Sequence, residues 1–401
     1  MISVAEALAV VTGGLVPVAV EQVGLEAADG RVLAEDVAAR LTQPPCAVSA
    51  MDGYAVRGED ARRVPATLRL IGESAAGAPF AGRLTTGTAV RISTGAPLPE
   101  GADAIVIQED TAVDGAAVTV RTPAESGRWI RPAGLDFSAG QVLLRAGQTL
   151  TPRDVGLAAA MNVPWLRVRR RPRIAVVATG DEIVWPGEPR GPAQIVGSNS
   201  FILAAAIERL GGRTLNLGVA RDDEDSLRTL IAGCRGADLL VTTGGASAGD
   251  HDLVRKVLTA SGLDLGFYRV AMRPGKPLMF GRLGEVPVLG LPGNPVSVGV
   301  TVEVFLRPMV AALLGLPPGA GPAPAAVLGR DLAANDLRQD YLRARLSREP
   351  GGALVATPFA QQDSAQLVLL CAADCLVVRP PLAPPALAGD PVEIVPLTGG
   401  R

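Results

Sequence analysis

Apolar runs alternate with amphipathic segments along residues 172–316. Each run is short and ends in a turn rich in glycine or polar residues, which is typical of a buried strand. In the segment 198–212, Leu203, Ile207 and Leu210 recur at helical spacing and share one face. This alternation predicts a parallel, doubly wound α/β sheet, in which ligands bind at the carboxyl ends of the strands. The expected strands are 173–180, 214–220, 237–245 and 286–295, and the expected helices are 198–212, 226–234, 250–261 and 296–316.

The rest of the chain carries other patterns. Residues 41–138 hold short apolar alternations separated by glycine and proline, which predict a small all-β domain. The flanking stretches 17–40 and 139–171 give mixed strand and helix signals, and we expect them to form one mixed α/β domain. Residues 1–16 predict an N-terminal helix, and the short strands of 322–401 predict a second β domain.

Composition and charge exclude several classes of protein. The chain has 401 residues, of which 48% are hydrophobic, enough for about two to four domains. A net charge of −2 argues against a large footprint for nucleic acid. No signal peptide is expected, and no uncharged apolar run of about 18 residues predicts a membrane span. The four cysteines form no CxxC pair, and Cys371 and Cys375 are predicted to pack in a core. We therefore expect a cytoplasmic protein without nucleic-acid or membrane partners.

Histidine and lysine are both scarce, which excludes or limits some kinds of active site. His251 is the one histidine, so a multi-histidine metal site is impossible. Lys256 and Lys276 are the only lysines, so Schiff-base chemistry has two candidates at most. Carboxylates, arginines and glycines abound instead, which suits anion binding beside an oxygen-ligated metal such as Mg²⁺.

Several strand-end loops carry candidate ligand groups. In TTGGASAGDHD (242–252), Gly244 and Gly245 let backbone amides approach an anion, while Asp250 and Asp252 can either cap the next helix or bind a metal. In TGDE (179–182), the acidic pair is expected to project into the strand-end crevice.

Two proline-containing loops are also candidates. In LPGNPVS (291–297), Asn294 is a credible N-cap and Pro295 fits the first helical position, whether the loop is a plain turn or a ligand site. In RPGKP (273–277), two prolines stiffen a loop that carries Arg273 and Lys276, a charge pair suited to phosphate or an oxyanion. Arg269 is expected on the same strand as Arg273, facing the same side.

The order of these motifs resembles the molybdopterin molybdenumtransferase family, which includes the E domain of gephyrin. The motifs that carry the resemblance are SAMDGYAVR, RISTGAPLP, GLDFSAG, ATGDEI, SNS, TTGGASAGDHD, RPGKP and GLPGNPVS. The resemblance covers essentially the whole chain. It implies a multi-domain α/β fold with a doubly wound MogA-like domain, an inserted β domain, a mixed α/β region and a C-terminal β barrel. It also implies a homodimer with the active cleft between subunits, and the insertion of molybdenum into adenylylated molybdopterin with release of AMP, assisted by Mg²⁺.

The resemblance carries functional roles onto matching positions. The expected catalytic residues are Asp52, Asp136, Glu182, Asp252 and Lys276, of which Asp52, Glu182 and Asp252 are expected to hold Mg²⁺. The expected substrate-binding residues are Thr94, Asp222, Gly244, Gly245, Ser247, Arg269, Arg273, Pro292, Gly293, Asn294, Pro295 and Ser297. Arg338 and Ser364 align with residues proposed to hold molybdate. Arg269 and Arg273 stand where relatives commonly have lysines, which keeps the charge and alters the donor geometry.

Three other functions remain open at this point. A molybdopterin adenylyltransferase shares the α/β domain but would not need the flanking β domains, and such an enzyme is also a possible partner. A non-catalytic scaffold of the gephyrin type would not need the acidic site residues. A tungsten-specific paralogue would differ in pocket details that no motif reports.

Overall fold

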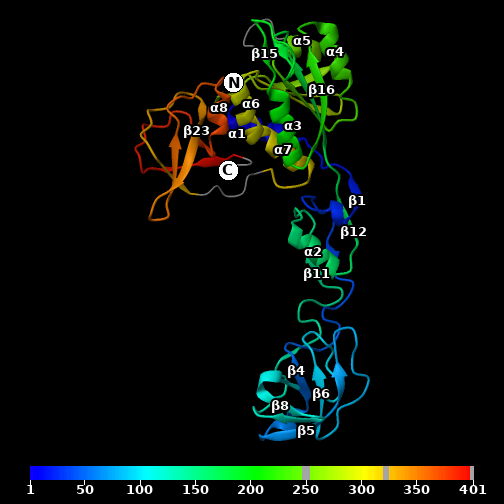
Figure 1. Cartoon of the computed structure of the whole chain (residues 1–401). Helices are drawn as coiled ribbons and strands as arrows, with labels where there is room; N and C mark the ends of the chain where they lie inside the picture. The colour runs from blue at the N-terminus through cyan, green and yellow to red at the C-terminus, as the bar shows by residue number, and fades with distance from the viewer. Residues whose placement is uncertain (246–252, 319–324, 398–401) are drawn as a thin grey trace. The chain divides into compact units, whose positions relative to one another are not determined.

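The computed structural model describes residues 1–245, 253–318 and 325–397 (Figure 1). The chain divides into two compact units, which are described separately below. The first unit contains Met1–Glu21, Gly30–Val32 and Val168–Arg401, and the second contains Gln22–Asp29 and Leu33–Arg167.

The first unit is built on a six-stranded sheet with the strand order β16-β13-β17-β21-β20-β18. Its strands are β13 (Arg173–Thr179), β16 (Arg213–Ala220), β17 (Leu239–Thr243), β18 (Leu263–Phe267), β20 (Met279–Leu283) and β21 (Val286–Leu291). The first four strands of that order are mutually parallel, so the alternation of strands and helices is confirmed as a doubly wound α/β fold. Strand β20 runs antiparallel to both of its neighbours, β21 and β18, and a tight turn at Gly284, where φ is +60°, joins β20 directly to β21.

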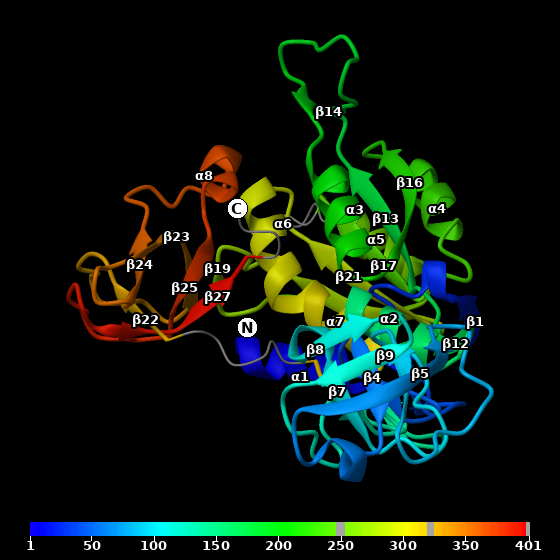
Figure 2. The ribbon, with the colours of Figure 1, turned by 60° about the horizontal axis from the view of Figure 1, so that its bottom comes forward.

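Side chains of β13 alternate between two hydrophobic cores. Ile174 and Val176 join a core on one face of the sheet, and Ala175 and Val177 join a core on the other. Because both faces are buried, the strand is a continuous apolar run. The first core is covered by α1 (Val4–Gly13), α3 (Asn199–Arg209), α6 (Pro295–Thr301) and α7 (Arg307–Leu313), and the second by α4 (Glu224–Ala232) and α5 (Leu253–Ala260) (Figures 1 and 2).

The long helix expected after the PGNP turn is present. It comprises α6, the π-helical turn η4 (Val302–Leu306) and α7. Pro295–Leu313 is long and apolar enough to meet the criterion for a membrane span, but 78% of its apolar window is buried inside the fold. Its hydrophobicity is therefore explained by its position in the protein core.

The C-terminal part of the first unit is a curled, seven-stranded sheet. The strand order is β26-β22-β24-β23-β25-β27, and β19 (Met272–Arg273) adds to β23 in parallel. The other strands are β22 (Ala326–Leu328), β23 (Gln339–Arg348), β24 (Leu354–Pro358), β25 (Cys375–Arg379), β26 (Pro391–Val392) and β27 (Ile394–Pro396), with a short helix α8 (Leu367–Cys371). Through β19, the chain of the α/β domain directly extends this second sheet.

The second unit contains another six-stranded sheet, with the order β7-β4-β6-β5-β9-β8. Its strands are β4 (Gly53–Val56), β5 (Ala66–Ser74), β6 (Thr88–Ile92), β7 (Ala104–Ile107), β8 (Thr111–Asp114) and β9 (Ala117–Val120). Its shorter elements are β2 (Val37–Ala38), β3 (Val48–Ser49), β10 (Ile130–Arg131), β11 (Val142–Leu144), α2 (Pro152–Ala160) and the 3-10 turns Leu25–Ala27, Gly58–Ala61 and Gln108–Asp110. A two-stranded sheet of β1 (Val20–Gly24) and β12 (Trp165–Arg169) includes two of the four points where the chain passes from one unit to the other.

Candidate functional site

A pocket of about 710 Å³ lies at the carboxyl ends of β13, β17 and β21. This is where a doubly wound sheet is expected to bind a ligand. Its walls include the start of α3, the loop before α6, and the segment 183–196 that contains β14 (Ile183–Val184) and β15 (Ile195–Val196) (Figure 2). Ala365 and Leu367 of the C-terminal part complete the lining.

Glycine allows the strand ends to approach one another closely. Gly244 has φ of +89°, and a Cβ atom there would lie 2.4 Å from the carbonyl oxygen of Thr179. A Cβ at Gly293 would lie 3.6 Å from the Cα of Gly244, so the turns after β17 and β21 are in contact. The two glycine turns that the sequence singled out therefore lie side by side and share the pocket.

Asn199 ties the start of α3 to both turns. Its Nδ2 donates to Thr243 Oγ1 at 3.0 Å and to the Gly293 carbonyl oxygen at 2.7 Å. The Thr243 hydroxyl in turn donates to the carbonyl oxygen of Pro292 at 3.1 Å. The N-cap of α3 is Ser198, whose side chain makes no capping hydrogen bond. Asn199 is thus a positioning residue that the motif SNS could have suggested.

Asn294 joins the α/β domain to the C-terminal part of the same unit. Asn294 and Pro295 occupy the N-cap and first helical positions of α6, as predicted. The Asn294 side chain does not cap the helix, however, because its Nδ2 donates to Ser364 Oγ at 2.7 Å. The backbone N–H of Val296 also donates to the Ser364 carbonyl oxygen at 3.2 Å. Ser364 is therefore held beside the pocket, whereas Ser297 is buried within α6 and does not line it.

The acidic residues after β13 fall into two groups. Glu182 is the one charged residue lining the pocket within the described part of the chain, and no hydrogen bond to its carboxylate is formed by those residues. Asp181 and Asp222 instead bind each other's backbone N–H, at 3.1 and 3.4 Å, and so join the loops after β13 and β16. Asp222 therefore has a loop-joining contact, in addition to the substrate role that the resemblance implies.

The basic residues expected to act together, Arg269, Arg273 and Lys276, have different surroundings in the structure. Arg269 lies between β18 and β19, so the expectation that it shares a strand with Arg273 is wrong. The chain leaves one sheet after β18 and joins another at β19, which breaks the regular alternation of side chains. The Arg269 guanidinium lies over the ring of Tyr268, 5.5 Å from its centroid. Lys276 is exposed, and the described residues provide no ion-pair partner for its ammonium.

Arg273 and Arg338 belong to a neutral cluster with two aspartates. Arg273 pairs with Asp340, which is 4% exposed, and with Asp336 at 3.5 Å. Arg338 Nη2 donates to Asp336 at 2.7 Å. The Arg338 side chain and backbone N–H both bind the Asp336 carboxylate and lower its pKa to about 2. Both arginines are therefore already paired with aspartates, and the Asp336 carboxylate stays charged near neutral pH, a feature that the spacing DLRQD could have indicated.

In the second unit, the structure brings together Asp52 and Thr94. The Asp52 carboxylate accepts hydrogen bonds from the backbone N–H of Thr94 at 2.6 Å and from its hydroxyl at 2.9 Å. These two bonds, the backbone one first, lower the pKa of Asp52. Asp136 lies in another loop and lines a pocket of about 500 Å³, together with Gly95, which follows Thr94, and Arg131.

Replacing Thr94 with valine removes the hydroxyl donor and keeps the backbone donor. The pKa of Asp52 should then rise toward its ordinary value of 3.8 while remaining below it. Because folding lowers this pKa, the Asp52–Thr94 pair stabilises the fold above the ordinary carboxyl range and loses its effect as pH falls through the lowered pKa. Carboxyl ¹³C NMR titration of the wild-type and variant chains measures the shift, and identical titrations would show that the hydroxyl contributes nothing.

The expected metal ligands lie in separate parts of the chain. Asp52 belongs to the second unit and Glu182 to the first. Asp252 and Ser247 lie outside the described residues, as do Asp250 and His251. Among the residues that the structure describes, no three His, Cys, Asp or Glu side chains form a group that could hold a metal by themselves.

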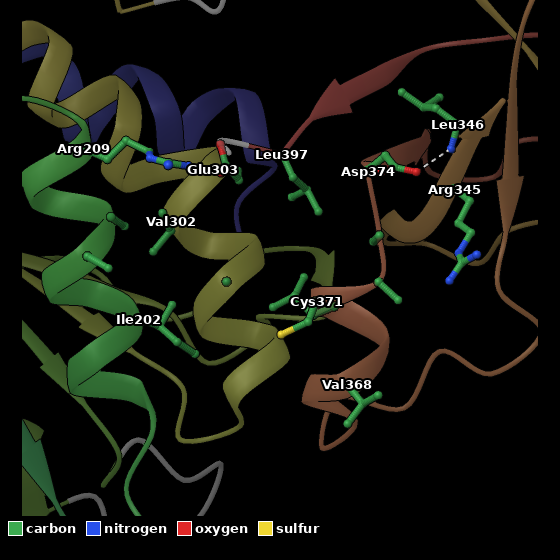
Figure 3. A pocket seen from close by; sticks show the side chains of 16 residues that line it. Ile202, Arg209, Val302, Glu303, Arg345, Leu346, Val368, Cys371, Asp374 and Leu397 are labelled. Carbon is green, nitrogen blue, oxygen red and sulfur yellow. Dashed lines mark hydrogen bonds between the residues drawn. The ribbon is translucent and has the colours of Figure 1, made fainter. Parts of the chain in front are cut away.

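A second pocket of the first unit is distinct from this candidate site. It encloses about 1000 Å³ between α3, α6 and the C-terminal part of the first unit (Figure 3). Charged side chains line it, including Arg209, Arg345 and Asp374, but no predicted site residue does. Cys371 also lines this pocket and is exposed, so the prediction of a core position for it is wrong, whereas Cys375 is buried as expected. Leu367–Cys371 is a short helix at the surface, which turns only part of the apolar run inward.

The fold and the pocket define a multi-domain α/β protein with a candidate ligand site at the strand ends of a doubly wound sheet. Three family models match in the same order along the chain. They are the MoeA N-terminal region (domain I and II) at residues 2–162, the probable molybdopterin binding domain at 175–312, and the MoeA C-terminal region (domain IV) at 325–397.

Relatives of known sequence and structure agree. Molybdopterin molybdenumtransferase 2 of Mycobacterium tuberculosis is 38% identical over 94% of this chain and 95% of its own length. The molybdopterin molybdenumtransferase of a Nostoc species is 36% identical over 90% of this chain and 85% of its own. The crystal structure of the molybdopterin biosynthesis MoeA protein from Pyrococcus horikosii superposes with a TM-score of 0.85 and 32% identity, covering 100% of both chains. The chain belongs to the MoeA family of molybdopterin molybdenumtransferases, and the resemblance and the fold class predicted from its sequence are confirmed.

Proposed function

We propose that this enzyme inserts molybdenum from molybdate into adenylylated molybdopterin and releases AMP, as the last step of molybdenum-cofactor biosynthesis. The observation that carries the proposal is the strand-end pocket, in which two glycine turns meet and Glu182 presents a carboxylate with no hydrogen bond from the described residues. Backbone amides at glycine turns suit phosphate groups. The names of the relatives supply the molybdopterin substrate.

The charge of the pocket supports a role for Mg²⁺. A phosphate-bearing substrate beside the Glu182 carboxylate would be repelled unless a cation lay between them. Mg²⁺ usually takes one or two protein carboxylates and completes its shell with water and phosphate oxygens, so one free carboxylate in the pocket is a suitable donor set. We assign Glu182 as a ligand, with Asp52 and Asp252 as the further ligands that the family resemblance implies. Bound Mg²⁺ would neutralise charge that develops on the phosphoanhydride.

The remaining residues have binding and positioning roles in this proposal. The turns at Gly244 and Gly293, with Lys276, hold the phosphates, and Asp136 orients the reacting groups. Ser364, held by Asn294, contacts the oxyanion. The Asp336 carboxylate already binds Nε and Nη2 of Arg338, so molybdate must either use the remaining N–H groups of this guanidinium or displace Asp336.

We also propose a homodimer whose active cleft includes residues of both subunits, a cytoplasmic location, and transfer of the adenylylated intermediate from a partner adenylyltransferase. An adenylyltransferase activity of this chain itself is disfavoured, because the chain carries the MoeA N-terminal and C-terminal regions in addition to the molybdopterin-binding domain.

The proposal is tested by measuring AMP release from adenylylated molybdopterin by the purified chain. AMP release should require molybdate and should stop when Mg²⁺ is removed by a chelator and resume when Mg²⁺ is restored. A parallel series with tungstate reports the metal preference. Consumption of ATP with plain molybdopterin would identify an adenylyltransferase, and a chain inactive in both assays would contradict the proposed function.

A further inference from the structure

One wall of the strand-end pocket is apolar and aromatic. Trp185 and Phe201 both line it, and their ring centroids lie 5.6 Å apart with the ring planes at 90°. Phe201 is 47% exposed although it stands in the first turn of α3. Ile195 and Val196 of β15 line the same wall and are 53% and 48% exposed. Large apolar side chains that gather at one concave site and remain exposed are typical of ligand contact.

The geometry of the pair favours a flat ligand. In an edge-to-face arrangement, the edge of one ring covers a single face of the other, so other ring faces stay free to stack. The backbone of Trp185 is held locally, because its N–H donates to Glu188 Oε2 at 2.9 Å. Phe201 is fixed by the helix that Asn199 anchors. Both aromatic residues therefore stand on backbone that hydrogen bonds hold in place.

Polar groups of the same pocket lie beside the glycine turns. Thr179 is 3% exposed, and neither its Oγ1 nor Asn199 Oδ1 has a hydrogen-bond partner within the described ranges. Buried polar atoms are normally paired, so two such atoms on lining residues indicate a ligand that carries polar atoms as well as an apolar surface. A volume of about 710 Å³ is within the range of pockets that hold a ligand of nucleotide size.

We propose that Trp185 and Phe201, with Ile195 and Val196, hold a flat bicyclic nitrogen heterocycle of the substrate, while its phosphate lies toward the Gly244 and Gly293 turns. This inference rests on the proposed function and names the specificity-determining residues of the same site. Both the adenine and the pterin of adenylylated molybdopterin have this chemistry, and the binding experiment distinguishes them.

The first test uses Trp185 as its own reporter. The other two tryptophans, Trp129 and Trp165, lie outside the pocket, so the double variant W129F/W165F leaves Trp185 as the sole indole. Its fluorescence is followed during titration with AMP, with a pterin phosphate, and with ribose 5-phosphate, which has no base. Quenching by AMP assigns the wall to adenine, and quenching by the pterin phosphate alone assigns it to the pterin. Ribose 5-phosphate should have no effect.

The second test uses kinetics in the wild-type background. Phe201→Ala and Trp185→Ala should each raise the KM for adenylylated molybdopterin about tenfold, the usual loss when a base–aromatic stack is removed. Phe201→Leu keeps an apolar side chain without a ring and should lose nearly as much, whereas Trp185→Phe keeps a ring and should restore most of the affinity. Val368→Ala, which changes an exposed apolar residue of the larger pocket, is the matched control and should leave KM unchanged.

The outcomes separate this inference from the proposed function. If the wild-type chain releases AMP but Phe201→Ala and Trp185→Ala keep its KM, the aromatic wall does not bind the heterocycle, and the proposed function stands. Equal quenching by ribose 5-phosphate, or a Phe201→Leu variant with wild-type KM, would also overturn the inference. A wild-type chain that releases no AMP with molybdate contradicts the proposed function itself, whatever the binding titrations show.

Discussion

Glutamine in place of Glu182 should slow molybdate-dependent AMP release on the order of 100-fold, by removing a charge that the proposed metal binding requires. The substitution keeps the size and shape of the side chain. Gly180 has φ of +137°, and a Cβ atom there would lie 2.4 Å from Glu182 Oε2, so the carboxylate folds back over this glycine. Glutamine fits the same space, and the loss should therefore be electrostatic. It should appear in kcat and in a higher Mg²⁺ requirement, measured as AMP release across a magnesium titration.

Glu188→Gln provides the control for this prediction. Glu188 follows Glu182 in the same loop but does not line the pocket, and its carboxylate accepts only the backbone N–H of Trp185 among the described residues. A glutamine oxygen can accept the same bond, so AMP release should stay within about twofold of wild type. A Glu182→Gln variant with wild-type turnover and the same magnesium requirement would remove Glu182 from the metal site.

The α/β sheet could be predicted from the sequence because the pattern that marks each strand or helix lies in adjacent residues. The central strands β13 and β17 are continuous apolar runs buried on both faces, and a helical periodicity follows each of them. The same reasoning failed for Arg269. The chain changes sheets between β18 and β19, and the partner of β19 begins at Gln339, far along the chain. Where a strand ends, a spacing of four residues no longer places two side chains on the same face.

The candidate site was only partly predictable for a similar reason. The glycine turns and the PGNP loop can be recognised from adjacent residues. Their contact is expected because the carboxyl ends of parallel strands lie at the same edge of a sheet. Asn199 acts through Thr243 and Gly293, which lie 44 and 94 positions away. Trp185 and Phe201 meet only because the segment between them returns to the start of α3. Arg338 was assigned to an anion from the family resemblance, while its nearest anion is Asp336, two residues before it. Long-range packing decides each of these cases.

Alanine in place of Gly53 should destabilise the second unit by about 3 kcal/mol or more. Gly53 begins β4, which lies between β6 and β7, and it pairs with Ile92 and Ile107. A Cβ atom at Gly53 would lie 2.0 Å from the carbonyl oxygen of Val106, a backbone atom that cannot rotate away. The methyl group can be accommodated only if β4 and β7 separate, and separation breaks the ladder hydrogen bonds of β4. Calorimetry of the full chain should show the transition of this unit lowered by roughly 10 °C or more.

Gly156→Ala is the matched control, because it adds the same methyl group to the same unit without a clash. Gly156 lies within α2, and a Cβ there would meet no atom within 4 Å. Alanine should stabilise this helix by about 0.5–1 kcal/mol.

The Gly53 variant should also lose AMP release under the proposed function, since Asp52 precedes the strand and its carbonyl oxygen accepts the backbone N–H of Gln108 at the end of β7. Strand separation would break this bond and shift the backbone that carries the Asp52 carboxylate. If Gly53→Ala melted with the wild-type chain, the close packing of β4 against β7 would be wrong, and the position of Asp52 would require another explanation.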